Sequence, residues 1–133
     1  MTLAEVRDWL KTISAAEHFY IGKLDAKQDK SLGVYSRAAL GQPPDIALGG
    51  LSCTKTAVKQ VSLLLHWNQN AKETEAAAQA LFEALQAAGP IQIGQTQVAF
   101  LQLLVPEPVD VGTDDNGVYE RVIWADFYYR RSD

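Results

Sequence analysis

Few residues of this 133-residue chain have the types and the spacing that catalytic or metal chemistry requires. Gly22 and Lys23 resemble the end of a phosphate-binding loop. The full motif needs a glycine five residues before Gly22 and a serine or threonine after the lysine. Those two positions hold Glu17 and Leu24. The pair therefore predicts no nucleotide site.

The segment from Gly112 to Gly117 has the acidic composition of a calcium loop. An EF-hand would need an acid where Gly112 stands and a glutamate six residues after Gly117, where this chain has Ile123. The dipeptide Asn116-Gly117 is instead typical of a hairpin turn. We interpret the segment as a polar loop that ends in a turn, with a weak surface cation site as the alternative.

His18, His66 and Cys53 could act together as zinc ligands only if folding brought them together, because none has the short spacing of zinc sites. His66 falls on the polar face of a predicted strand, so we expect it to be solvated or at an interface. We expect Cys53 to be a small buried hydrophobe. Serine and threonine residues lie outside any nucleophile-elbow pattern, and the acids form no recognisable pair. We therefore predict no enzymatic activity, no metal and no cofactor.

The elements that would position these residues follow from hydrophobic periodicity. Thr2 and Glu5 form a capping box before a helix with apolar spacing from Leu3 to Ile13. A second helix follows Asn70, with Glu73 at the reciprocal position, and Gly89-Pro90 ends it with a left-handed glycine cap. The predicted strands cover residues 19–24, 31–37, 58–67, 91–93, 97–105 and 118–129, and the first two are expected to form a hairpin.

Two strands have clear faces. In residues 58–67, Val61, Leu63, Leu65 and Trp67 point one way. The last strand is apolar on both faces: one carries Ile123, Ala125, Phe127 and Tyr129, and the other carries Val122, Trp124 and Tyr128 with Asp126. Trp124 and Tyr128 therefore either meet a helix of the same chain or face another subunit.

These elements predict an α+β fold, with two main helices and a mostly antiparallel sheet, in a single domain over residues 1–133. The predicted order is helix, two strands, strand, helix, then two or three strands. The net charge of −4 argues against a protein whose main role is to grip nucleic acid. A single cysteine, a charged N-terminus and the lack of a long apolar run predict a disulfide-free protein of a cytoplasm-like compartment, away from membranes.

Three blocks of sequence resemble the minor capsid protein family of long-tailed bacteriophages. They are residues 46–50, 59–68 and 73–78, and the similarity continues through residues 108–120 and the aromatic strand that follows. This family is similar in architecture to tail terminator proteins. The resemblance implies a ring of six copies at the head–tail junction of the virion, assembled in the bacterial cytoplasm, that stops tail growth and helps the head attach.

The implied partners are further copies of the chain, the tail tube and the head-completion proteins. DNA would pass through the ring without specific binding. A ring contact joins two different surfaces of the subunit, which we expect in the loops 110–117 and 42–50 and on the aromatic strand. We expect the second loop to become ordered on contact with a partner. The predicted interface residues are Trp124, Asp126, Tyr128, Asp110, Asp114, Asp115, Asn116, Pro43 and Pro44.

Two other functions remain open at this point. A small α+β domain of this kind can bind a peptide or protein by pairing at the edge of its sheet, without catalysis. An enzyme whose site has no recognisable motif is the third alternative, which a screen of metals and nucleotides by thermal shift would test.

Overall fold

The computed structural model describes residues 1–131, so that the last two residues of the predicted domain lie outside the described part. Within those residues, two α-helices accompany a seven-stranded sheet that is antiparallel except for one strand pair. The elements are α1 Leu3–Leu10, β1 His18–Ile21, β2 Ser31–Ser36, the 3₁₀ helix η1 Leu51–Cys53, β3 Thr56–His66, α2 Ala71–Ala87, β4 Ile91–Ile93, β5 Thr96–Leu103, β6 Val109–Thr113 and β7 Tyr119–Arg130. The α+β class with a mostly antiparallel sheet is confirmed.

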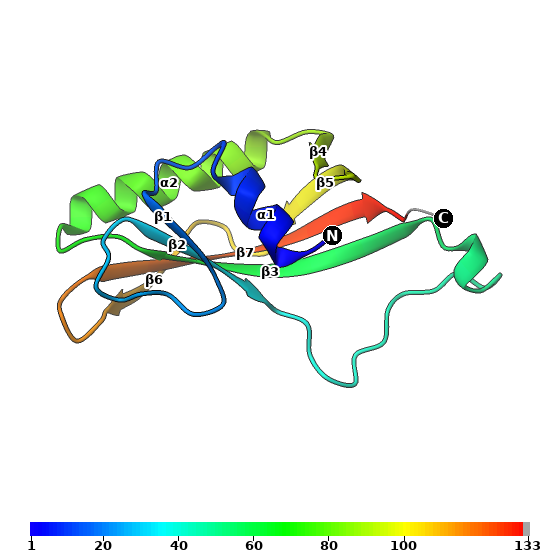
Figure 1. Ribbon diagram of the computed structural model, residues 1–133, viewed down its shortest axis with the longest axis horizontal. Helices are drawn as coiled ribbons and strands as arrows, with labels where there is room; N and C mark the ends of the chain where they lie inside the picture. The colour runs from blue at the N-terminus through cyan, green and yellow to red at the C-terminus, as the bar shows by residue number, and fades with distance from the viewer. Residues whose placement is uncertain (132–133) are drawn as a thin grey trace.

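The long strands β3 and β7 form the centre of the sheet, whose strand order is β1-β2-β3-β7-β5-β4 (Figure 1). They pair along their full length, from Thr56 opposite Arg130 to His66 opposite Glu120. The other edge of β7 is shared: β5 pairs with residues 125–129 and β6 with residues 119–122. Strand β6 was expected to be loop, so four strands follow α2 instead of two or three.

The expected hairpin of the first two strands is wrong, because β1 and β2 pair in parallel, from His18 opposite Ser31 to Ile21 opposite Val34. The link of residues 22–30 is long enough to return along the strand instead of turning tightly. It crosses one face of the sheet, where Leu24 lies against Gly33. A Cβ at Gly33 would lie 2.8 Å from the Tyr35 ring and 3.0 Å from the Leu24 side chain, so a larger residue there would require these side chains to move.

Helix α1 begins at the predicted capping box. The Thr2 hydroxyl accepts a hydrogen bond from the Glu5 amide at 3.2 Å, and the Glu5 carboxylate accepts one from the Thr2 amide at 3.0 Å. The helix buries Val6 and Leu10 against the sheet. Trp9 packs edge-on against Phe127 of β7, with 5.9 Å between the ring centroids.

Both ends of α2 depart in part from the prediction. Asn70 caps the first turn by accepting from the Glu73 amide at 3.1 Å, but the Glu73 carboxylate accepts from the Asn68 side chain instead of the Asn70 amide. At the other end Ala88 is extended, with φ −68° and ψ 112°. Gly89 is not among the glycines of residues 1–131 with positive φ. The predicted left-handed cap is therefore wrong, because the chain leaves the helix in an extended conformation before Pro90.

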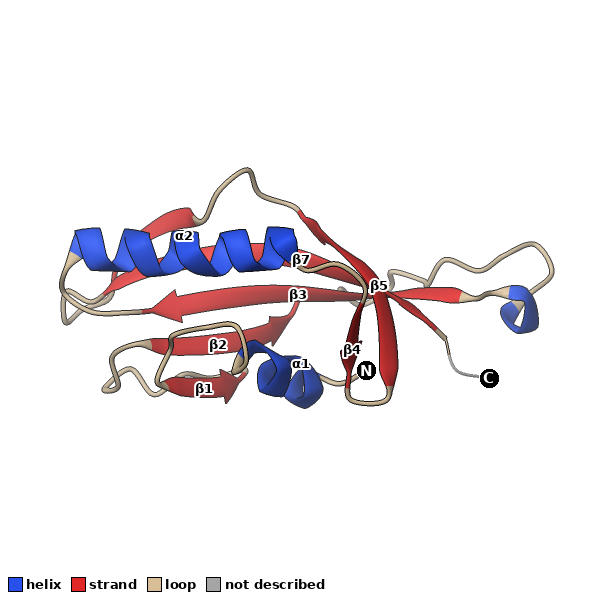
Figure 2. Ribbon diagram, turned by 90° about the horizontal axis from the view of Figure 1, so that it is seen from above, coloured by secondary structure: helices blue, strands red, loops and turns tan. Residues whose placement is uncertain are grey.

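The two helices cover the same face of the sheet, and the core lies between the helices and that face (Figures 1 and 2). Residues of α2, among them Leu81, Phe82 and Leu85, are buried with the predicted inward residues of β3 and β7. The side chains of Val61, Leu63, Ile123, Ala125 and Phe127 are fully buried. In the described part of the chain, neither helix is long and apolar enough to cross a membrane.

Candidate interaction surface

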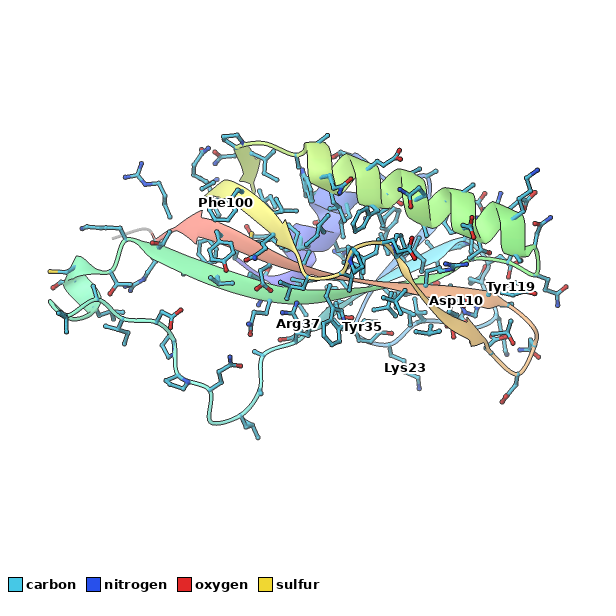
Figure 3. The ribbon with its side chains drawn as sticks, turned by 180° about the vertical axis from the view of Figure 1, so that it is seen from behind. Lys23, Tyr35, Arg37, Phe100, Asp110 and Tyr119 are labelled. Atoms are coloured by element: carbon cyan, nitrogen blue, oxygen red, sulfur yellow. The ribbon has the colours of Figure 1, made fainter. Side chains whose placement is uncertain are left out.

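Within residues 1–131, no α-helix covers the opposite face of the sheet (Figure 1). We call it the uncovered face. Strand alternation points Tyr35 of β2, Ser62 and Leu64 of β3, and Val122 and Trp124 of β7 toward it. Figure 3 shows Tyr35 and the neighbouring Arg37 on this side, away from α2. Trp124 was predicted to meet either a helix of the same chain or another subunit. The helix alternative is wrong, because α1 and α2 lie on the other side of the sheet.

Arg37 is the central polar group of the uncovered face. Its Nη2 atom donates to Asp126 Oδ1 at 2.8 Å, and its Nη1 atom donates to the Val61 carbonyl at 3.0 Å. The guanidinium carbon also lies 5.2 Å from the centre of the Trp124 ring, in a cation–π arrangement. Asp126, which was predicted to lie at a subunit interface, is thus a buried partner of Arg37 within the chain.

Aromatic and aliphatic side chains surround this ion pair. Trp124 exposes 45% of its surface, although it lies in the middle of the longest strand. Phe100 stacks on Tyr128 with 4.6 Å between the ring centroids, and the Tyr128 hydroxyl donates to Gln102 at 3.1 Å. A register shift between Val98 and Phe100 turns Phe100 to the uncovered face. The exposed apolar side chains of this face are thus held in place by their neighbours.

A long loop leads from β2 to β3 and extends beyond the body of the subunit (Figure 1). It carries Pro43 and Pro44, both exposed, and two fully exposed leucines, Leu40 at 105% and Leu48 at 110%. Between this loop and the uncovered face lies a groove of about 1130 Å³. We call it the loop groove. Pro43 and Ile46 lie on its loop side, Val58, Phe100 and Tyr128 on its sheet side, and Cys53, Lys55 and Arg131 at the base of the loop.

The C-terminal end of the long loop is hydrogen-bonded to the residue that follows β7. Arg131 donates through Nη1 to the carbonyl oxygens of Leu51 and Thr54 at 2.9 and 3.1 Å. Cys53 is exposed on η1, so its expected burial is wrong: η1 lies outside the sheet, and none of its three residues is buried.

The predicted acidic residues lie at the other end of β7. Asp110 is exposed on β6, 3.9 Å from Arg121, and Asp115 and Asn116 are exposed in the turn that follows. Asp114 holds this turn, because its Oδ1 atom accepts from the amides of Asn116 and Val118 at 2.9 Å each. Gly117 has φ +76°. The turn interpretation is confirmed, whereas residues 110–113 belong to a strand.

His66 is almost completely buried, at 1% exposure, so the expectation of a solvated histidine is wrong. Its Nδ1 atom lies 3.0 Å from Glu120 and its Nε2 atom 3.1 Å from the Ala26 carbonyl. Asp114 Oδ2 lies 3.7 Å from Nε2 and has no hydrogen-bond partner among residues 1–131. The loop 22–30, the turn and the start of β7 therefore meet at this histidine.

Tyr35 lies next to the same loop. Burial raises the pKa of the Tyr35 hydroxyl above its ordinary value of 10.0, and the Glu120 carboxylate raises it further. A backbone hydrogen bond with Leu24 opposes this change. The neutral phenol is therefore the form that the fold favours.

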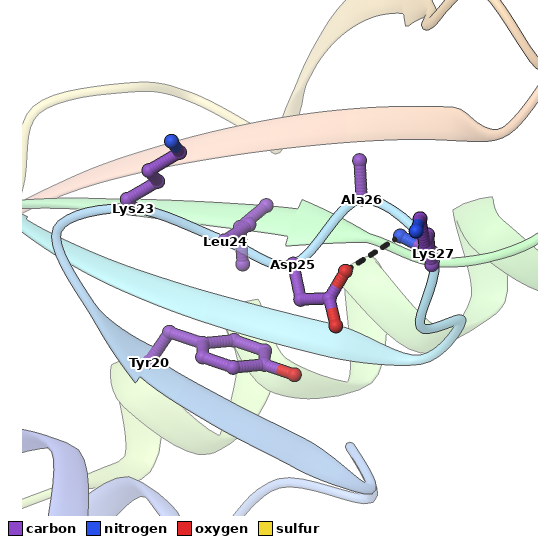
Figure 4. Close-up of a pocket in the computed structure, with 6 residues that line it drawn as sticks. All are labelled: Tyr20, Lys23, Leu24, Asp25, Ala26 and Lys27. Atoms are coloured by element: carbon purple, nitrogen blue, oxygen red, sulfur yellow. Dashed lines mark hydrogen bonds between the residues drawn. The ribbon is translucent and has the colours of Figure 1, made fainter.

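The residues first considered for chemistry are scattered. Gly22 and Lys23 lie in the loop after β1, beside a hollow of about 500 Å³ where Asp25 accepts from the Lys27 amide at 3.1 Å (Figure 4). Cys53 and His66 lie at opposite ends of β3. In the part of the chain that the structure describes, no three His, Cys, Asp or Glu side chains are arranged to hold a metal ion.

The structure divides the predicted interface residues into two groups. Trp124, Asp126, Tyr128, Pro43 and Pro44 lie on the uncovered face and around the loop groove. Asp110, Asp114, Asp115 and Asn116 lie around β6 and its turn. Sequence reasoning missed Arg37 and Phe100, and it considered His66 but did not predict its burial. Arg37 ends the predicted strand 31–37, but its partners Asp126 and Trp124 lie on a distant strand, so the pairing of the strands had to be known to identify its role.

A sheet that is covered by helices on one face, with ordered aromatic side chains exposed on the other, is typical of proteins that assemble with other proteins. The comparisons agree with this class. Residues 1–129 match the model of the bacteriophage tail terminator protein family, and the chain belongs to that family. It is therefore a structural protein of a phage tail and a component of the virion. Comparison with curated proteins finds no match.

Proposed function

We propose that this protein ends the growth of the phage tail by closing into a ring of six copies on the tail tube, where it presents a surface to the head. The observation that supports this proposal is the family match over residues 1–129 together with the uncovered face. The predicted minor capsid designation and the place at the head–tail junction belong to the same proposal. The role requires neither catalysis nor a cofactor.

The uncovered face supplies what such a ring needs. A specific interface buries about 800 Å² on each partner, and its energy is concentrated in a few aromatic and arginine side chains. Trp124, Arg37 and the stacked pair of Phe100 and Tyr128 have these residue types. Because each copy in a ring contacts two neighbours through different surfaces, the loop groove and the acidic turn can serve as the two sides of one contact.

The proposal is tested by assembly with the tail-tube protein of the same phage. Electron micrographs of the tube protein alone are expected to show tubes of variable length. Addition of this protein is expected to stop their growth and leave a ring-shaped density at one end, and such capped tubes are expected to bind filled heads. Tubes that grow equally long in its presence would contradict the proposal.

A further inference from the structure

The structure has two chemically complementary surfaces at opposite ends of the β3–β7 pair. One is the loop groove, whose lining combines apolar walls with the cations Lys55 and Arg131, the loop residue Asp45, and Asp126, whose charge is paired with Arg37. The other is the segment of residues 106–117, which contains β6 and the acidic turn. It carries four carboxylates, on Glu107, Asp110, Asp114 and Asp115, and no lysine or arginine. We infer that the loop groove of one subunit binds the 106–117 segment of the next copy in the ring. This inference rests on the proposed function.

The groove has the size and the lining of a peptide-binding site. Its volume of about 1130 Å³ exceeds the roughly 300–1,000 Å³ of small-molecule pockets. Its sheet side is formed by Val58, Phe100 and Tyr128, and the facing loop is rich in proline. Such a surface favours an extended segment that carries short apolar side chains.

Strand β6 matches that requirement. All five of its residues are exposed, and Val109 and Val111 expose 41% and 50% of their surfaces. Its outer edge is the edge of the sheet, so its backbone groups are available to another chain. The carboxylates of Asp110 and Asp115 would then lie near the Lys55 and Arg131 side chains of the neighbour, which gives the contact a charge complementarity.

Within one subunit, the acidic turn that follows β6 lies far from the groove. The groove includes Tyr128 near the end of β7, whereas β6 leads into Tyr119 at its beginning. Nine residues of extended strand separate these positions by about 30 Å. Contact between the surfaces therefore joins different copies through unlike patches, which is the arrangement that closes into a ring.

Cys53 offers a direct test, because it is exposed and lines the groove. The variant Val111→Cys places a second thiol on the exposed face of β6. Rings on tail tubes are treated with a short bismaleimide and separated on a denaturing gel. We expect a ladder of covalent oligomers up to the ring size. The same treatment of Val111→Cys in a Cys53→Ser background, and of Gln79→Cys on the exposed side of α2, should leave monomers.

A charge reversal tests the same contact without new thiols. Lys55→Glu and Asp115→Lys, each alone, are expected to raise the protein concentration for half-maximal ring formation by up to about fivefold, the size of one partly exposed ion pair. The two changes combined in one chain should restore the original concentration, since each contact regains a pair of opposite charges. Thermal unfolding of each monomer serves as the check that the fold is intact.

The outcomes separate the two proposals. Rings that form without a ladder, or a ladder that persists in the Cys53→Ser background, would overturn this inference and leave the proposed function standing. A wild-type protein that forms no ring, with or without the tail tube, would overturn the proposed function and the inference with it.

Discussion

Arg37 and Asp126 form an ion pair of 2.8 Å across 89 residues of sequence, and both side chains are largely withdrawn from solvent. The pair joins the residue after β2 to the middle of β7 and so fixes the start of the long loop against the sheet. Because Arg37 also lies over Trp124, the pair positions the largest exposed aromatic side chain of the uncovered face.

Loss of one member of this pair should destabilise the subunit. In Asp126→Ala, the partly buried Arg37 guanidinium loses its carboxylate partner but keeps the Val61 carbonyl, so we expect a loss of about 1–3 kcal/mol in the free energy of unfolding. Urea unfolding followed by tryptophan fluorescence measures the change. Asp115→Ala, at an exposed position in the turn, is the matched control and is expected to change stability by less than about 0.5 kcal/mol. Equal stability of the two variants would show that the pair contributes nothing.

Trp124→Ala should separate assembly from folding. The side chain is half exposed, so we expect the monomer to remain folded. If Trp124 is an interface anchor, its removal costs about 2 kcal/mol or more per contact, and rings should disappear at concentrations where the wild type forms them. Ile21→Ala, an equally exposed apolar residue on edge strand β1, is the control and should assemble normally. Normal assembly of Trp124→Ala would remove this residue from the interface.

His66→Ala should destabilise the end of the sheet at which three segments meet. Without the imidazole, Glu120 loses a contact of 3.0 Å and the Ala26 carbonyl loses one of 3.1 Å. Leaving such groups without a partner costs about 1–3 kcal/mol each. Chemical denaturation measures the loss, with His18→Ala on β1 as control. Hydrogen exchange should also quicken first in residues 22–30 and 114–118, and uniform exchange would contradict a local role.

Tyr35 should make the protein lose stability in alkali. Its pKa is raised by burial in the folded state, so the unfolded chain releases this proton first as the pH rises above about 10. The contribution is fully present below that pH and is lost above it. We expect Tyr35→Phe to lose less stability between pH 8 and about pH 11 than the wild type does. Urea unfolding at both pH values measures this, and equal losses would contradict the assignment.

Much of the core could be predicted from the sequence because local signals agreed with tertiary packing. The period-two pattern of Val61, Leu63 and Leu65 gave the correct inward face of β3. The capping residues Thr2 and Asn70 marked both helix starts. In these segments, the residue types and their spacing indicate which side chains are buried, so the partner strand need not be known.

The errors arose where the outcome depends on a distant partner. The parallel pairing of β1 with β2 goes together with the loop 22–30 crossing the sheet at Gly33, and no local pattern encodes that crossing. By strand alternation, His66 lies on the same face of β3 as the polar residues, yet Ala26, Asp114 and Glu120 cover it. Phe100 faces outward because of a one-residue register shift, which inverts the strand alternation.

The pairing of β3 with β7 also determines how much of the chain must be synthesised before the sheet can be completed. The central ladder joins a strand from the middle of the chain to one that is synthesised much later. A nascent chain that has reached β5 still lacks the strand against which β3, β5 and β6 all pair. A translation product that stops before β7 therefore lacks the strand that joins β1, β2 and β3 to β4, β5 and β6, so we expect it not to complete the sheet.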